Sequence, residues 1–213
     1  MGRRALRKLP VGVDLSPWLR TVEQLPQPWN AVELFNREAP LEVELGSGKG
    51  LFMSAACAAF PEVNFLGLEV AHKYAQHSAS RLARANARNG VMVSGDGLRV
   101  FREFLPATAV SAVHVYFPDP WWKKRHKKRR VVNPAFLQDV MRVLVPGGKL
   151  HLWTDVEEYF QTSLELIAAT PLLGPFEVIA KEAEHDLDYR THFERRTRQH
   201  DLPVYRAEFR KSA

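Results

Sequence analysis

An aspartate, two tryptophans and a dense group of cationic side chains stand within residues 118–130, "PDPWWKKRHKKRR". Prolines on both sides of Asp119 restrict its backbone, so the direction of its carboxylate is set locally. A carboxylate fixed in this way can stabilise positive charge that develops on a substrate. The flat faces of Trp121 and Trp122 can stack on an aromatic base, although we expect one of the two to lie in the core.

Seven of the eight residues 123–130 are lysine or arginine, whereas the net charge of the whole chain is +6. The rest of the chain therefore carries about one negative charge, and the basicity is local, as expected for a surface that binds phosphates. Runs of like charge are often only solvated. This run, however, is closely bracketed by an expected strand and an expected helix. We predict backbone contacts to nucleic acid from Lys124, Arg125, Lys127, Lys128, Arg129 and Arg130.

Strand-like and helix-like segments alternate through most of the chain, which predicts an α/β fold with a doubly wound, mostly parallel sheet. The expected strands are 41–45, 63–70, 91–94, 109–117 and 149–154, with further β-rich stretches near 176–180 and 203–210. The expected helices are 49–60, 71–90, 97–104, 134–145 and 156–169. We predict a basic, partly flexible arm with one short helix over 1–40, and a single domain over 41–213.

Ligands of such sheets bind beyond the carboxyl ends of the parallel strands. An acidic residue stands at each of the five expected strand ends: Glu44, Glu69, Asp96, Asp119 and Asp155. This clustering of acids predicts a functional site at that edge.

The stretch "ELGSGKG", residues 44–50, lies between an expected strand and an expected helix. Glycines at 46, 48 and 50 allow a tight turn and a close approach of a ligand to the backbone. A dinucleotide fingerprint needs Gly or Ala at the position of Leu51, and a P-loop needs Ser or Thr at the position of Gly50. The acid followed by G-x-G-x-G instead resembles the first motif of S-adenosylmethionine-dependent methyltransferases.

Two further acids extend this hypothesis. Glu69 ends the second strand, where an acid can accept hydrogen bonds from both ribose hydroxyls, although an acid is also favoured at a helix N-terminus. Asp96 follows the third strand, where this fold usually contacts the adenine amino group, although an Asp-Gly turn explains it equally well.

The segments "ELGSGKG", "GLEV", "PDPWWKKRHKKRR", "WTD" and "THFERR" together closely resemble the tRNA (guanine-N7)-methyltransferase family, across roughly residues 40–210. The resemblance implies the Rossmann-like fold of class I S-adenosylmethionine-dependent methyltransferases, with tRNA as partner and a guanosine of the variable loop as target. It implies cofactor contacts from Glu44, Gly46, Gly48, Gly50, Glu69, Asp96 and Asp119, with Asp119 also catalytic. It implies substrate contacts from Lys123, Asp155, Thr191, His192, Phe193 and Glu194. His192 stands where lysine is usual in the family.

Guanine N7 already presents a lone pair, so its methylation requires no strong general base. A carboxylate such as Asp119 can stabilise the charge that develops on the ring, and alignment of the reacting atoms supplies most of the rate. We expect Glu194 to read the N1 and N2 donors of guanine. Two alternatives stay open. One is a methyltransferase that acts on adenine amino groups, because "DPW" differs by one proline from the acid-proline-proline-aromatic motif of those enzymes. The other is a non-catalytic RNA-binding module of the same fold.

Other classes are disfavoured by composition. Cys57 is the single cysteine, which excludes a disulfide framework and suggests a reducing, cytoplasmic location. The histidines are not spaced as metal ligands, so we expect no metal. No apolar stretch approaches 18 residues, so we expect no membrane span. A monomer or a homodimer is expected.

Overall fold

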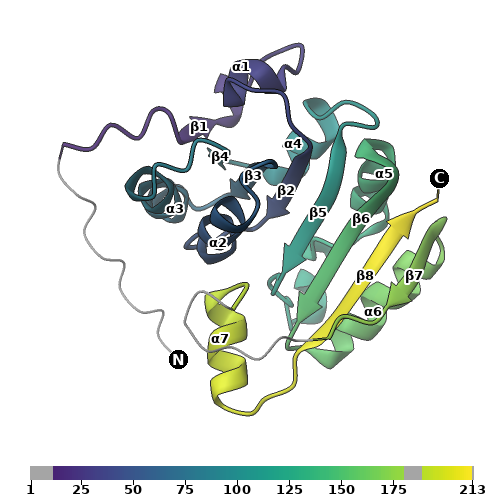
Figure 1. Ribbon diagram of the computed structural model, residues 1–213. Coiled ribbons are helices and arrows are strands. Elements are labelled where there is room, and N and C mark those ends of the chain that lie inside the picture. The colour runs from purple at the N-terminus through teal and green to yellow at the C-terminus, as the bar shows by residue number, and fades with distance from the viewer. Residues whose placement is uncertain (1–11, 180–188, 213) are drawn as a thin grey trace.

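The computed structural model describes residues 12–179 and 189–212 as one eight-stranded sheet flanked by helices on both faces (Figure 1). The strand order is β1-β4-β3-β2-β5-β6-β8-β7. The strands are β1 (Leu19–Thr21), β2 (Leu41–Leu45), β3 (Asn64–Glu69), β4 (Gly90–Ser94), β5 (Val110–Tyr116), β6 (Leu144–Thr154), β7 (Leu172–Phe176) and β8 (Tyr205–Lys211). The pairings from β1 through β6 are parallel, and β8 runs antiparallel to both β6 and β7.

Helices cover the two faces of the sheet with their apolar sides. The helices are α1 (Ala31–Phe35), α2 (Leu51–Ala59), α3 (His72–Arg84), α4 (Gly97–Glu103), α5 (Pro134–Val143), α6 (Glu157–Ala168) and α7 (His192–Gln199), with short 3-10 helices η1 (Val22–Gln24) and η2 (Lys124–Arg129). Buried side chains of α4, α5 and α6 pack on one face of the sheet, and those of α2 and α3 pack on the other.

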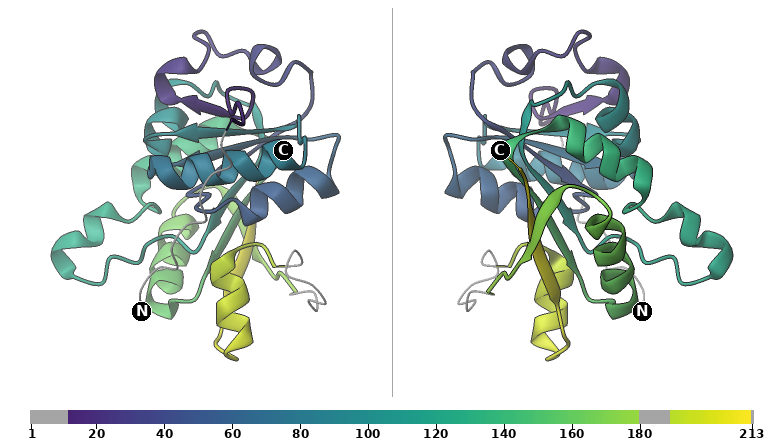
Figure 2. Two further views of the ribbon diagram at one scale, coloured as in Figure 1. Left: turned by 90° about the vertical axis from the view of Figure 1, so that its left-hand side faces the viewer. Right: turned by 90° about the vertical axis from the view of Figure 1, so that its right-hand side faces the viewer.

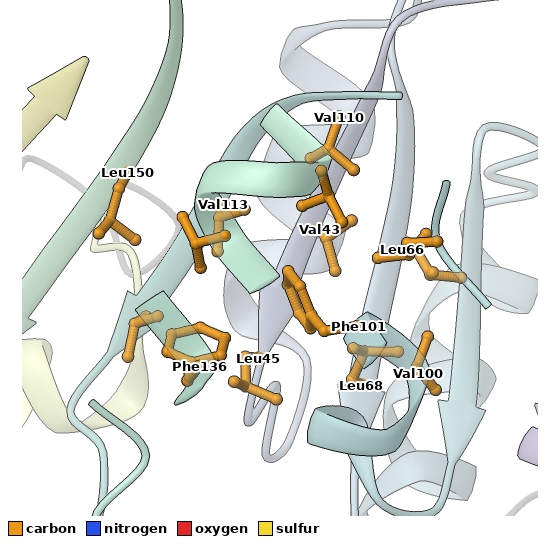
Figure 3. Packing of buried hydrophobic residues seen from close by; sticks show 14 of the residues in the cluster. Val43, Leu45, Leu66, Leu68, Val100, Phe101, Val110, Val113, Phe136 and Leu150 are labelled. Atoms are coloured by element: carbon orange, nitrogen blue, oxygen red, sulfur yellow. The ribbon is translucent and has the colours of Figure 1, made fainter. Parts of the chain in front are cut away.

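The larger core lies between the sheet and the layer of α4, α5 and α6 (Figure 3). Val43 and Val113 of the two central strands are fully buried there against Phe101 of α4 and Phe136 of α5. The two phenylalanine rings meet edge to face with their centroids 5.3 Å apart. Because every second residue of a strand faces this core, the alternate residues Glu42, Glu44, His114 and Tyr116 face the α2 side.

The predicted fold class is confirmed, with instructive differences at the two ends of the chain. The first is β1, which the sequence did not predict and which extends the sheet beside β4. The expected short helix of the first forty residues is α1, and Leu34 and Phe35 bury it in the larger core. The predicted stretch 176–180 was misplaced, because the strand β7 ends at Phe176. The segment around Thr191 forms the unpredicted helix α7.

The carboxyl ends of the parallel strands meet at one edge, toward which the arrowheads of β5 and β6 point in Figure 1. Leu45 is paired with both Leu68 and Val115, and Tyr116 is paired with Trp153. The loops that follow β2, β3, β5 and β6 therefore start side by side, and α7 packs against this same edge.

Candidate active site

The glycine loop between β2 and α2 adopts a conformation that other residues rarely take. Gly46, Gly48 and Gly50 have φ angles of 84°, 53° and 70°. A Cβ on Gly50 would lie 1.9 Å from Ser78 Oγ of α3, so this glycine permits the close packing of α2 on α3. A Cβ on Gly46 would meet nothing within 4 Å. The first part of the loop therefore presents bare backbone to open space, as a ligand cradle requires.

Glu69 joins this loop to the neighbouring strand. Its carboxylate accepts hydrogen bonds from the backbone N–H of Gly48 and of Ala71, both at 2.8 Å. Only 8% of Glu69 is exposed. Asp96 is exposed and caps α4, because its Oδ1 accepts hydrogen bonds from Leu98 and Arg99 N–H. Asp96 therefore has a structural role as a helix cap, which the sequence did not predict, and contacts of either acid to a cofactor stay predictions.

Glu44 lies deeper than the other acids of this edge. It is 2% exposed, and its Oε2 has no hydrogen-bond partner among the described residues. Burial raises the pKa of Glu44 to about 8, and the neighbouring negative charge of Glu69 adds to the rise. An unpaired carboxyl oxygen in a buried site is expensive unless a donor or a cation reaches it.

The loop after β5 holds Asp119 between two strained residues. Phe117 and Trp121 have φ angles of 50° and 47°, a left-handed conformation that costs non-glycine residues about 1–2 kcal/mol each. Backbone strain of this kind is concentrated at functional sites. Phe117 N–H is anchored to the carbonyl of Trp153 at 2.7 Å, and Asp119 itself is exposed at the strand end.

Neither tryptophan of this loop belongs to the core, so that expectation was wrong. Trp121 is half-buried beneath the basic residues, where the Arg129 guanidinium lies 5.1 Å from its ring and His126 meets it edge-on. Trp122 is 68% exposed. Trp122 is therefore the ring that is available to stack on a base.

The basic run, residues 123–130, contains η2 and projects from the body of the molecule beside the candidate site (Figure 2). Lys123, Lys124, Arg125, Lys128 and Arg129 are exposed. Lys127 is also exposed but donates to Glu158 Oε1 at 2.6 Å. Arg130 is 6% exposed, donates to the Pro120 carbonyl and to both oxygens of Glu158, and lies over the Tyr159 ring. Its contact with RNA stays a prediction, and it would require release of these partners.

The C-terminal segment reaches the site through α7. Thr191 caps this helix by accepting a hydrogen bond from Glu194 N–H at 3.0 Å, and Phe193 is 47% exposed and stacks on Phe117 with centroids 6.2 Å apart. Glu194 is 2% exposed, and its carboxylate accepts from Arg190 N–H and from the Arg198 and Arg206 guanidinium groups. Reading of guanine by Glu194 stays a prediction, and it would require release of these donors.

His192 and Asp155 complete the predicted substrate residues. His192 begins α7, and its Nε2 lies 3.4 Å from Arg81 Nη2 of α3. Burial and the nearby cationic side chains, Arg81 first among them, lower the pKa of His192 to about 4, so its imidazole is neutral at pH 7. Asp155 is exposed directly after β6.

Several residues of the site were not anticipated. The rings of Phe52, Tyr116 and Trp153 form an aromatic group beside Glu44, with centroid distances of 5.1 Å for Phe52–Tyr116 and for Tyr116–Trp153. Arg190 places its guanidinium carbon 5.6 Å from the Phe52 ring. The position of Arg190 next to the "THFE" segment was the one sequence signal that could have suggested it.

Two classes of site are not found in the described ranges. Within residues 12–179 and 189–212 no group of three or more His, Cys, Asp or Glu side chains is placed so as to hold a metal ion. None of the helices described is both long enough and apolar enough to cross a membrane.

Known proteins resemble this chain in sequence and in fold. Residues 38–207 match the sequence model of a family described as "putative methyltransferase". A protein of Rhodopirellula baltica named tRNA (guanine-N(7)-)-methyltransferase is 47% identical, over 99% of this chain and 80% of its own length. A protein of the same name from Myxococcus xanthus is 32% identical over the full length of both chains.

Solved structures support the fold alone, because their identities are low. The 16S rRNA methyltransferase KamB aligns with a TM-score of 0.61 at 15% identity, covering 85% of this chain and 92% of its own. The aminoglycoside resistance methyltransferase NpmB1 aligns with a TM-score of 0.57 at 18% identity, covering 88% and 94%. The 47% identical relative, the matching family model and the fold agree with one another. The chain therefore belongs to the tRNA (guanine-N7)-methyltransferase family of class I S-adenosylmethionine-dependent methyltransferases.

Proposed function

We propose that this chain transfers a methyl group from S-adenosylmethionine to N7 of a guanosine in the variable loop of tRNA. The observation that carries the proposal is one juxtaposition at the carboxyl edge of the sheet. The glycine loop follows β2, the Asp119 loop follows the paired strand β5, and the exposed basic run continues directly from the Asp119 loop. A cofactor cradle, a fixed carboxylate and a phosphate-binding surface are thus adjacent.

The residues present fit the cofactor. The cradle at Gly46 is open, and Glu69 at the end of the neighbouring strand β3 lies within hydrogen-bond distance of Gly48. Glu44 supplies a buried oxygen that lacks a partner among the described residues. When bound there, S-adenosylmethionine supplies an electrophilic methyl group.

The chain's own residues position the base. Exposed cations of the basic run, Lys124 and Lys128 among them, hold the tRNA backbone. Trp122 offers a stacking face to an unstacked base. Asp119 holds the ring and stabilises the positive charge that the guanine acquires as N7 is methylated. Because N7 carries no proton, none of these residues has to act as a general base.

A cytoplasmic location, a monomeric or homodimeric state and the division into an arm over 1–40 and a domain over 41–213 stay predictions. The alternative of adenine amino-group methylation receives no support from the named relatives, which are tRNA (guanine-N(7)-)-methyltransferases.

The decisive experiment is product analysis. The protein is incubated with an unmodified tRNA transcript and S-adenosylmethionine that carries an isotopically labelled methyl group, and the digested nucleosides are analysed by mass spectrometry. We expect label in 7-methylguanosine, and no label when the variable-loop guanosine is replaced by adenosine. Label in N6-methyladenosine would contradict the guanine assignment. Binding of tRNA without any incorporation would identify a non-catalytic RNA-binding module.

A further inference from the structure

Glu44 is a buried acid of the candidate cofactor site. Glu44 faces the α2 side of the sheet, and its register partner on β5 is His114. His114 is itself buried, and the Phe52 ring lies 4.6 Å from its ring. No hydrogen on a described residue reaches Glu44 Oε2. A cationic group of a ligand would therefore gain a desolvated ionic hydrogen bond at this position.

The aromatic group beside this acid contains a second buried polar atom without a partner. Trp153 is 6% exposed, and its Nε1 has no acceptor among the described residues. A tryptophan N–H is a donor only, so the ligand group that would satisfy it is an acceptor. This region thus contains an acceptor without a donor, on Glu44, and a donor without an acceptor, on Trp153, among the described residues. The Trp153 ring belongs to the same aromatic group through its contact with Tyr116.

Arg190 brings the matching positive charge to this region. Its guanidinium carbon lies 5.6 Å from the Phe52 ring and 5.9 Å from the Trp153 ring. The residue is exposed, so its side chain is accessible to a ligand. Its backbone is held in place, because Arg190 N–H donates to Glu194 Oε2 at 2.6 Å. The charge of Arg190 also acts on Glu44, whose pKa it moves downward against the larger effect of burial.

We propose that Arg190 binds the carboxylate of the methionine moiety of the cofactor, next to Glu44. The family resemblance already implies a cofactor contact from Glu44, which in this arrangement binds the ammonium group of the same moiety. This assignment rests on the proposed function in taking S-adenosylmethionine as the ligand. An α-amino acid end carries one positive and one negative group on the same carbon atom, and the site offers one acid and one guanidinium to match them. Guanidinium is the side chain best suited to a carboxylate, because its N–H groups match the two oxygens.

The contact has a consequence for the substrate side of the site. Arg190 immediately precedes Thr191, the cap of α7, and Phe193 of the same helix stacks on Phe117 of the Asp119 loop. A cofactor carboxylate bound by Arg190 connects the start of α7 to the cofactor site. The segment predicted to frame the guanine is thereby positioned by the bound cofactor.

The test compares two ligands that differ only in the carboxylate. Isothermal titration calorimetry measures the dissociation constants of S-adenosylhomocysteine and of its decarboxylated analogue, which keeps the ammonium group. The unaltered protein is expected to bind S-adenosylhomocysteine ~10–100-fold more tightly, the range of a charge-assisted hydrogen bond. Arg190→Gln is expected to bind the two ligands within about threefold of each other, a margin below one such bond, and Arg190→Lys to fall between.

Two variants act as controls. Arg196→Gln removes a neighbouring arginine that lies over the Phe193 ring, and it is expected to keep the full discrimination. Glu44→Gln is expected to weaken both ligands by similar factors, because both carry the ammonium group. Thermal unfolding of each variant verifies that the fold is retained.

Discrimination that survives in Arg190→Gln would overturn the proposal, and so would equal weakening of both ligands in that variant. Failure of the unaltered protein to bind S-adenosylhomocysteine would overturn this assignment together with the proposed function. Discrimination that depends on Arg190, in a protein that forms no 7-methylguanosine, would uphold the role of Arg190 and contradict the proposed function alone.

Discussion

Arg130, the last residue of the basic run, is joined to Glu158 of α6 by two hydrogen bonds, Nη2 to Oε2 at 2.5 Å and Nη1 to Oε1 at 3.3 Å. Its Nε also donates to the carbonyl of Pro120 at 2.8 Å. One arginine therefore connects the Asp119 loop to helix α6. Arg130 therefore stabilises the Asp119 loop, whereas the exposed residues of the basic run before Arg130 remain available to RNA.

Arg130→Ala should destabilise the protein by about 1–3 kcal/mol, because it leaves the Pro120 carbonyl and Glu158 without their main donor. Lys128→Ala, a change in the same run at an exposed position, should stay within about 0.5 kcal/mol of the unaltered protein. Chemical denaturation measures both. An Arg130→Ala variant with unchanged stability but weakened tRNA binding would show that Arg130 is a phosphate ligand after all.

Removal of exposed charge from the basic run should weaken tRNA binding through its salt dependence. For Lys124→Ala with Lys128→Ala we expect the slope of log K against log salt to become shallower by roughly one for each phosphate that the variant no longer binds. The matched control is Arg88→Ala with Arg102→Ala, two arginines that precede β4 and β5 at the opposite edge of the sheet. Binding titrations at several salt concentrations would refute the assignment if both pairs altered the slope equally.

Asp119→Ala should reduce kcat by about 10²–10³-fold, in line with the loss of one group that stabilises developing charge. The dissociation constant for tRNA should change by less than about threefold, since the exposed cations that we propose to bind the backbone are intact. Asp119→Asn separates the two roles of the carboxylate: it keeps the shape and part of the hydrogen bonding but removes the charge. Single-turnover kinetics and binding assays distinguish these effects, and parallel losses of turnover and affinity would argue against a catalytic Asp119.

Glu44 predicts a pH dependence of stability. Burial raises its pKa in the folded protein to about 8, from an ordinary value near 4.5. The neutral carboxyl is favoured by the fold, so the stabilisation from Glu44 is complete below about pH 4.5 and is lost as pH rises through about 8. Glu44→Gln, which mimics the neutral form at every pH, should therefore gain stability relative to the unaltered protein between about pH 5.5 and about pH 8.5.

Denaturation curves of the ligand-free proteins at those two pH values measure this difference. The same unfolding experiment with saturating S-adenosylhomocysteine is the companion measurement, because an ammonium group beside Glu44 favours the ionised carboxylate. A stability difference that does not change with pH would mean that Glu44 does not titrate in this range.

The order of strands and helices from β2 to α6 could be predicted from the sequence because each element carries a local signal. Apolar runs mark the buried strands, and the proline before Ala135 and the glycines after Leu45 mark a helix start and a tight turn. The acids at the strand ends followed from the same pattern, because parallel strands bring their carboxyl ends to one edge. The glycine loop after β2 and the Asp119 loop after β5 could therefore be located from the sequence alone.

What only the tertiary structure decided are the contacts between segments distant in sequence. Arg129 and Arg130 are neighbouring arginines that the sequence of the basic run does not distinguish. Arg130 is nevertheless buried against Glu158, whereas Arg129 is exposed over the Trp121 ring. Nothing near Arg190 in the sequence indicates that its side chain lies over Phe52, because two residues so distant in the sequence meet only in the folded chain. The burial of a side chain and its hydrogen-bond partners depend on which surfaces meet in the folded chain. A local sequence pattern does not contain this information.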